Sequence, residues 1–190
     1  LENQRLKTIV DDYLVKSDTV FAKVLSDKGS PFLKSIIINK GSKHNISLGM
    51  LAMDGEYLVG KVVEVNYLSS RVLLLSDLNS KIPVTVEPNG LLSILSGTGE
   101  KYGIIQYSKE YENIEGESII YTSGAGGLFK AGIPIGRIKA NDLSEKKKVK
   151  FFSDFSQLKF LKILSFKENE AEWQNIEIKI LLKKYYHSYH

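Results

Sequence analysis

The chain has 190 residues, of which 43% are hydrophobic and 25% are charged, so it can bury a core and is not wholly disordered. It contains no cysteine and three histidines, which excludes disulfides and thiolate sites, and we expect no metal or other cofactor. The net charge of +4 comes from scattered basic residues without an RNA- or DNA-binding motif, so we expect no nucleic-acid partner.

Residues 1–16 carry the best helical pattern of the chain, with apolar side chains at three- and four-residue spacing between charged ones. A stretch this short is marginal as an isolated helix. We interpret it as an amphipathic helix that packs on the domain, or as the end of a coiled coil through which the chain oligomerises. The residues expected on its apolar stripe are Leu6, Ile9, Val10 and Tyr13.

From Thr19 onward the pattern changes to short β-branched segments separated by turn residues. Strands recur about every ten residues without helices between them, which predicts an all-β fold. Roughly 10–12 strands fit two small six-stranded β-barrels better than one large sheet. The expected strands are 19–25, 35–39, 58–66, 71–75, 82–86, 91–95, 102–107, 118–121, 133–138, 149–152 and 159–166.

Domain boundaries are predicted at the segments richest in turn residues and charge. Residues 88–90 (PNG) are the preferred crossing between the barrels, and 141–148 (NDLSEKKK) are a second. Residues 167–190 are acidic around Trp173 and then aromatic and basic, which is typical of a disordered tail or of a docking segment. The predicted first barrel comprises 17–87 plus about 149–166, and the second comprises 88–148; which barrel 149–166 joins is left open by the pattern.

Residues 122–139 are the most glycine-dense part of the chain. Glycine is needed where φ is positive or where two backbones approach closely. A proline in this stretch cannot donate a ladder hydrogen bond, so it belongs at a strand start, an edge or a bulge. We interpret the segment as a strand, a sharp turn and a second strand. The residues assigned to this structural turn are Gly124, Gly126, Gly127, Gly132, Pro134 and Gly136.

Two chemical interpretations compete for the same glycines. A phosphate-binding loop would open a helix, whereas Gly-Ile-Pro-Ile-Gly cannot start a stable one. A chymotrypsin-like serine protease would use His44, Asp77 and Ser123, which occur in the required chain order. However, Thr122 stands where such proteases carry an aspartate, and His44 lies in a turn rich in Lys and Asn. We therefore expect no enzyme and no catalytic residue.

A set of short motifs runs in order through residues 1–164. They are 1–6 (LENQRL), 39–42 (NKGS) leading to 46–50 (ISLGM), 58–62 (LVGKV), 69–77 (SSRVLLLSD) with 82–84 (IPV), 122–129 (TSGAGGLF) with 132–136 (GIPIG), and 154–158 (DFSQL). In this order they resemble the extracytoplasmic part of the rod shape-determining protein MreC family. Asn45, Tyr57 and Lys130 depart from the residues usual in that family; Asn45 can still adopt the left-handed conformation of the glycine that it replaces.

The resemblance implies two small β-barrels behind a coiled coil, in the periplasmic domain of a single-pass inner-membrane protein. No run of about 18 apolar residues occurs in the chain, so the membrane anchor is expected upstream of Leu1. The implied function is a non-catalytic scaffold of the cell-elongation machinery that maintains rod shape. Its implied partners are the elongation-specific penicillin-binding transpeptidase, other morphogenesis membrane proteins and further copies of itself, as a dimer or a filament.

How such a scaffold would hold its partners is a separate hypothesis. Exposed strand edges could supply backbone hydrogen bonds, and aromatic side chains could act as anchors. Leu128 and Phe129, on the glycine loop, and Tyr107 and Tyr111, near a polar turn, are the candidate partner-binding residues. The alternatives to a scaffold are the serine protease and a lipid- or peptidoglycan-binding β module.

Overall fold

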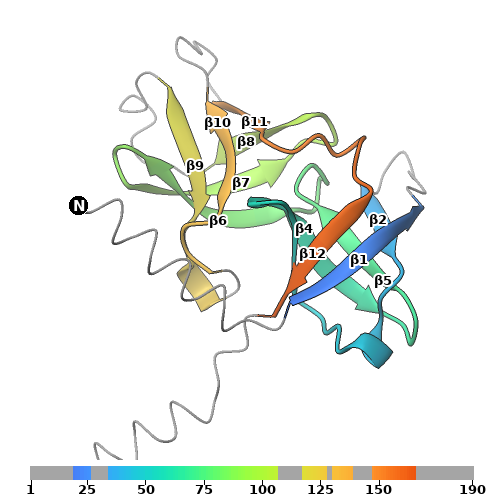
Figure 1. Ribbon diagram of the computed structural model, residues 1–190. Helices are drawn as coiled ribbons and strands as arrows, with labels where there is room; N and C mark the ends of the chain where they lie inside the picture. The colour runs from blue at the N-terminus through green and yellow to red at the C-terminus, as the bar shows by residue number, and fades with distance from the viewer. Residues whose placement is uncertain (1–18, 27–33, 107–116, 128–129, 139–146, 166–190) are drawn as a thin grey trace, which may run out of the picture.

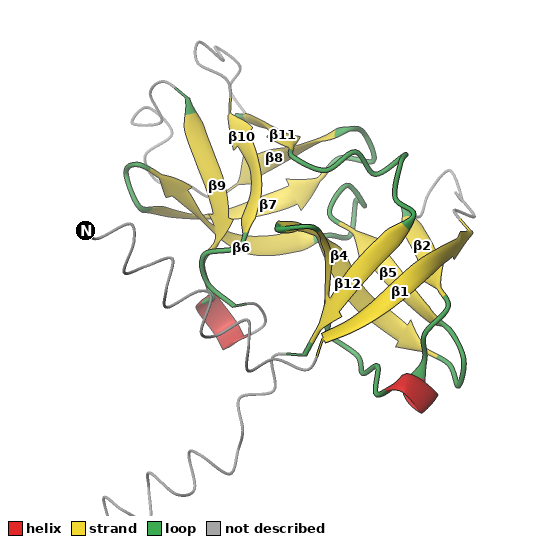
Figure 2. Cartoon of the chain, viewed as in Figure 1, coloured by secondary structure: helices red, strands yellow, loops and turns green. Residues whose placement is uncertain are grey.

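The computed structural model describes residues 19–26, 34–106, 117–127, 130–138 and 147–165. These residues form two closed β-barrels of six strands each, with short 3-10 turns at η1 (Ser42–His44) and η3 (Ala125–Gly127) (Figures 1 and 2). The all-β fold with two small barrels is thereby confirmed. The predicted helix at 1–16 and the tail at 167–190 fall outside the described ranges. Within those ranges, no helix has the length and apolar character needed to cross a bilayer.

The first barrel combines strands from the beginning and the end of the chain. Its last strand in the sequence inserts between its first and third, pairing antiparallel with both. In order around the barrel, the strands are β1 (Thr19–Ser26), β12 (Phe160–Leu164), β3 (Leu51–Asp54), β4 (Tyr57–Val65), β5 (Ser70–Leu74) and β2 (Ser35–Ile38).

The second barrel is built from one continuous part of the chain, and its neighbouring strands are antiparallel. Figure 1 shows it beside the first barrel, connected to it at two places. In order around the barrel, the strands are β10 (Pro134–Ile138), β11 (Lys148–Phe151), β8 (Tyr102–Gln106), β7 (Leu91–Gly97), β6 (Lys81–Glu87) and β9 (Ser118–Thr122).

The strand membership corrects the predicted domain boundaries. β6 was expected in the first barrel but pairs with β7 and β9, and β11 pairs with β8 and β10 of the second barrel. Residues 88–90 form the β6–β7 turn, where Gly90 has φ 66°. The chain instead crosses between barrels at residues 75–80, here called the first crossing, and returns at 152–159, the second crossing.

β3 was not expected from the sequence because both of its faces are buried. Ala52 packs in the core of the first barrel, whereas Leu51 and Met53 pack in a cluster with the core of the second. Leu58 and Leu164 join that cluster from β4 and β12. The outer surface of the first barrel is therefore covered by the second barrel here, and each leucine so buried contributes about 1.5–3 kcal/mol of hydrophobic free energy.

Candidate interaction surfaces

The glycine segment forms the β9–β10 connection of the second barrel. Gly124, Gly126 and Gly132 have φ of 73°, 76° and 84°, a region in which a side chain is strained. Gly136 is needed for a different reason, because a Cβ there would lie 2.4 Å from the carbonyl oxygen of Lys150. Pro134 begins β10, at a register shift opposite β9. These residues determine the backbone conformation of the connection. Gly127 is the last residue of η3.

Thr122, at the end of β9, pins this turn from inside. Its buried Oγ1 donates to the carbonyl oxygen of Lys130 and accepts from the N–H of Ile133 at 2.9 Å. Its backbone accepts from Gly132 N–H at 2.8 Å. The sequence analysis considered Thr122 at the position of a protease aspartate and as part of the 122–129 motif, and did not predict this structural role. A serine or threonine between a strand and a glycine-rich turn indicates that its hydroxyl hydrogen-bonds the backbone of that turn.

The three residues of the protease hypothesis make hydrogen bonds in three separate turns or loops. Ser123 Oγ accepts from the backbone N–H of Ala125 at 3.2 Å, as in a turn. His44 lies in η1, where its Nδ1 accepts from Gly41 N–H at 3.3 Å. Within the part of the chain that the structure describes, no hydrogen bond joins His44, Ser123 or the third candidate, Asp77, to one another.

Asp77 is a fully buried residue of the first crossing. Its carboxylate accepts from the N–H of Lys34 at 2.7 Å and from the N–H of Asn79 at 2.8 Å. The same stretch is tied to the second barrel, since Gly97 N–H donates to Ser80 O at 3.0 Å. Asp77 therefore fixes the first crossing between the barrels by directional hydrogen bonds.

The second crossing is aromatic. The Phe155 ring lies 5.0 Å from that of Phe151 and packs against the hydrophobic clusters of both barrels. The Phe152 ring lies 4.9 Å from Tyr57 of β4, which joins a side chain of the crossing to the first barrel. This crossing contains the DFSQL motif, so that motif serves the contact between the barrels.

Asp154 shapes the exposed side of the second crossing. Its Oδ1 accepts from the N–H of Ser156 at 3.0 Å and from the hydroxyl of Ser156 at 2.7 Å. The hydroxyl bond, then the backbone bond, and to a smaller extent the charge of Lys101, hold the pKa of the Asp154 carboxyl below its usual range. This is the geometry of an Asx turn.

A cavity of about 530 Å³ opens where the crossings meet. Its rim carries three lysines and two acidic residues, so its charge is mixed. No group of His, Cys, Asp and Glu suited to a metal ion occurs among the described residues. The charged lining residues are Lys34, Glu100, Lys101, Lys150 and Asp154.

One end of the first barrel exposes a small aromatic and aliphatic surface. Tyr67 and Leu68, in the β4–β5 loop, are 66% and 57% exposed. The adjacent η1 turn is held to this loop by Lys43 N–H, which donates to Tyr67 O at 3.1 Å, and the Lys43 ammonium lies 6.0 Å from the Tyr67 ring. Asn45, which follows η1, has φ 61°, which confirms its left-handed conformation. We call Lys43, Tyr67 and Leu68 the loop-end surface.

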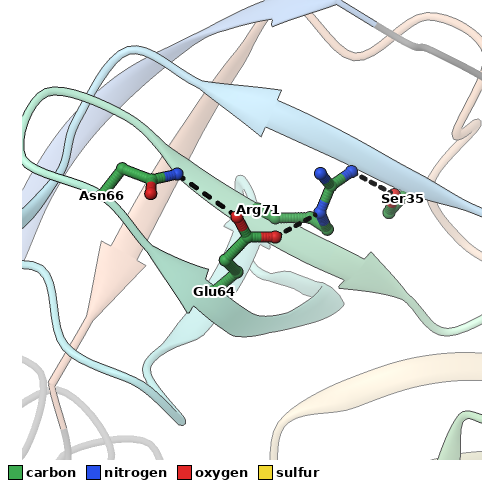
Figure 3. A network of polar contacts seen from close by, with 4 residues as sticks. All are labelled: Ser35, Glu64, Asn66 and Arg71. Atoms are coloured by element: carbon green, nitrogen blue, oxygen red, sulfur yellow. Dashed lines mark hydrogen bonds and ion pairs between the residues drawn. The ribbon is translucent and has the colours of Figure 1, made fainter.

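A neighbouring face of the first barrel is polar instead. Arg71 Nε donates to Glu64 Oε2 at 2.8 Å, and the network reaches Asn66 and Ser35 (Figure 3). The hydrogen bond from Arg71 is the main reason that the pKa of Glu64 lies below its usual range. Exposed pairs of this kind contribute little stability. None of these four residues is aromatic, in contrast to the loop-end surface.

Of the expected partner contacts, the structure tests the strand edges but not the candidate side chains. Every strand of the described barrels has a neighbour on both sides, so the hypothesis that exposed strand edges capture partners is wrong for this part of the chain. Leu128, Phe129, Tyr107 and Tyr111 lie outside the described ranges, and their role stays a prediction. The same holds for the helix residues Leu6, Ile9, Val10 and Tyr13.

Comparison with known proteins identifies the family. The family model described as "Rod shape-determining protein MreC, barrel core" matches residues 24–165. The cell shape-determining protein MreC of Cereibacter sphaeroides is 35% identical over 147 residues, which cover 77% of this chain and 49% of the relative. The chain thus spans about half the length of that curated relative.

Solved structures show the same fold. The crystal structure of MreC from Pseudomonas aeruginosa has a TM-score of 0.70 and 28% identity, with 78% of this chain and 99% of that chain covered. The major periplasmic domain of the cell shape-determining filament MreC (orthorhombic form) has a TM-score of 0.68 and 22% identity, covering 78% and 96%. A complex between a penicillin-binding protein and MreC from Helicobacter pylori has a TM-score of 0.60 and 15% identity, with 80% of this chain and 100% of that chain covered.

The two closed barrels, the glycine turn between β9 and β10 and the DFSQL crossing thus agree with a sequence match that covers both barrels. The chain belongs to the MreC family of rod shape-determining proteins.

Proposed function

We propose that this chain is the periplasmic barrel region of a non-catalytic scaffold that maintains rod shape in the cell-elongation machinery. The observation that carries this proposal is the family match over residues 24–165. A relative of the same fold is described as a periplasmic domain, which supports the location. Residues 1–16 are proposed to serve self-association.

The proposed principal partner is the elongation-specific penicillin-binding transpeptidase, with other morphogenesis membrane proteins and further copies of this chain beside it. A protein of this fold forms a complex with a penicillin-binding protein in Helicobacter pylori, which supports this choice. Because the barrels are closed, binding must use projecting side chains and not strand addition. The loop-end surface offers a tyrosine, a leucine and a lysine for that purpose.

The junction between the barrels fixes the position of one barrel relative to the other. Hydrogen bonds at Asp77 and packing of Phe155 join the barrels at both crossings. A partner bound to one barrel is then held at a defined position relative to a partner bound to the other. Such positioning needs no reacting group.

Co-purification from envelope extract tests the proposal. The full chain is expected to recover the transpeptidase, and Tyr67→Glu combined with Leu68→Glu is expected to reduce recovery about tenfold, the loss of roughly 1.4 kcal/mol of binding. Leu128→Glu with Phe129→Glu tests the glycine-loop prediction in the same assay. Leu92→Glu, at a leucine of the second barrel that is 69% exposed, is the matched control. Recovery of no transpeptidase by the unaltered chain would contradict the proposal.

The alternatives predict other outcomes. Ser123→Ala is expected to leave cell shape intact if the chain is a scaffold, and to abolish its function if the chain is a serine protease. A lipid- or peptidoglycan-binding module would bind vesicles or wall fragments directly, in a salt-dependent manner and without a protein partner.

A further inference from the structure

The outer face of β1 and β12 carries exposed apolar side chains and lysines. Phe21 and Leu25 of β1 are 70% and 57% exposed, and Phe160 of β12 is 64% exposed. Lys23 lies between Phe21 and Leu25 in β1, and Lys162 lies two residues after Phe160 in β12. Figure 1 shows β1 and β12 side by side on one side of the first barrel. We call these five residues the β1–β12 patch.

The strand register makes the patch continuous. Phe21 is opposite Lys162, and Lys23 is opposite Phe160, so each phenylalanine has a lysine as its cross-strand neighbour. Diagonal neighbours on one sheet face are about 7–8 Å apart, close enough for both rings to contact one inserted side chain. The alternating residues Ala22 and Leu161 point inward and are 1% exposed. Aromatic rings and lysine side chains therefore alternate over the outer face of these two paired strands.

The patch has no negative charge of its own. Neither β1 nor β12 contains an acidic residue. Within the described ranges, neither Lys23 nor Lys162 forms an ion pair. A complementary occupant would bring carboxylates and at least one large apolar side chain.

The chain itself contains such a segment directly after β12. Residues 167–178 (KENEAEWQNIEI) hold four glutamates, one lysine, one tryptophan and two isoleucines. They follow the last residue of the family match, 165, so they are not explained by the barrel core. The tryptophan, Trp173, is nine residues beyond Leu164, and nine extended residues span up to about 30 Å. Five-residue β12 is about 17 Å long, so Trp173 can reach every residue of the patch.

We propose that residues 167–178 bind intramolecularly across the β1–β12 patch, with Trp173 against Phe21 and Phe160 and glutamates beside Lys23 and Lys162. The link is short, so the effective concentration of the segment at the patch is high and little new contact is needed. The segment thereby shields an apolar surface of the first barrel from other proteins. A partner that uses this face has to displace the segment first.

The single tryptophan of the chain makes the proposal directly testable. In the full chain, Trp173 emission is expected to be blue-shifted and protected from acrylamide. Phe21→Glu with Phe160→Glu is expected to shift the emission to that of the unfolded chain and to raise quenching several-fold. Leu92→Glu, which places a glutamate on an exposed site of the second barrel, is the control and should change neither value. Because all three altered residues are exposed, circular dichroism should show an unchanged fold.

A charge exchange tests the pairing itself. Lys23→Glu with Lys162→Glu is expected to release Trp173, and adding Glu170→Lys with Glu172→Lys is expected to restore its protection. Raising the salt concentration should weaken protection in the unaltered chain.

Several outcomes would overturn the proposal. Trp173 emission that is already solvent-exposed, or unchanged by the double phenylalanine variant, would do so. Protection that depends on protein concentration would assign the patch to a second copy. A blue shift that arises only with vesicles of anionic phospholipid would assign it to a membrane surface. None of these results changes the expected recovery of the transpeptidase, so the two proposals fail separately.

Discussion

The two crossings between the barrels differ in chemistry although they join the same two bodies. The first crossing is polar, and its Asp77 carboxylate accepts backbone hydrogen bonds in a fully buried position. The second crossing is aromatic and packs Phe155 against both barrels. Hydrogen bonds are directional and lose most of their value on small displacements, whereas apolar packing tolerates them.

This difference indicates a division of labour. The first crossing determines how one barrel is oriented on the other, and the second contributes apolar burial that holds them together. Changes at the first crossing should therefore act sharply and depend on geometry, and changes at the second should scale with the apolar area that is removed.

The largest effect is expected from Gly97→Ala. A Cβ at this position would lie 2.0 Å from the carbonyl oxygen of Asp77, which is backbone and cannot rotate away. We expect a loss of about 4 kcal/mol of unfolding free energy, from the clash and the displaced Gly97–Ser80 hydrogen bond. Urea denaturation measures it. Gly103→Ala is the control, since its nearest obstacle at 2.7 Å is the end of the Leu95 side chain; an equal loss there would contradict the special role of the first crossing.

Asp77→Ala should follow. The substitution removes the buried carboxylate that accepts from the partly buried N–H groups of Lys34 and Asn79, for an expected loss of about 2 kcal/mol. Asp77→Asn keeps one oxygen acceptor and should cost roughly half as much by the same reasoning. Chemical denaturation of both variants checks the order. Equal stability of Asp77→Ala and the unaltered chain would show that the hydrogen bonds do not fix this crossing.

Phe155→Ala removes a half-buried ring from the second crossing. Full burial of a phenylalanine makes truncation cost 3–5 kcal/mol, so about 2 kcal/mol is expected here. Phe155→Leu retains most of the apolar volume and should cost under about 1 kcal/mol. Thermal unfolding measures both, with Leu92→Ala, at an exposed side chain of the second barrel, as a control. An equal loss of stability in Phe155→Ala and Phe155→Leu would argue against a packing role for Phe155.

The smallest effect concerns pH. The folded chain holds the pKa of Asp154 below its usual range, so the folded state binds fewer protons than the unfolded state in acid. Its contribution is present above about pH 4, the usual carboxyl range, and is lost as the pH falls through the lower folded value. Ser156→Ala should therefore flatten the acid end of the stability curve. Urea midpoints from about pH 5 to pH 3 measure this, and an unchanged curve would contradict it.

Much of the fold could be predicted from the sequence because its turns are local. Glycine, proline and Asx residues at regular intervals marked the strand ends, and the positive φ of Gly132 and Gly90 follows from local chemistry. The same local chemistry misplaced the domain boundary. Residues 88–90 have the composition of a linker and also of a hairpin turn, and only the long-range pairing of β6 with β9 decides between them.

The interaction surfaces could be predicted less well. Leu51 and Phe21 are both apolar residues of short strands, yet one is 0% exposed beneath the second barrel and the other is 70% exposed. Which outer face is covered depends on how the barrels are placed, and that placement arises from contacts between residues far apart in the chain. Asp77 was considered as the aspartate of a serine-protease triad for the same reason: its local sequence does not show that its neighbour is Lys34.

The insertion of β12 between β1 and β3 has a consequence for biogenesis. The second barrel uses only residues 81–151, so all its strands are present once that stretch has been made. The first barrel cannot be sealed until residue 164 emerges, and until then β1 and β3 each lack a neighbour. A newly made chain therefore passes through a stage with one finished module and one open module, whose unpaired strands are vulnerable to aggregation. Late closure also means that truncations before β12 should harm the half of the molecule that was synthesised first.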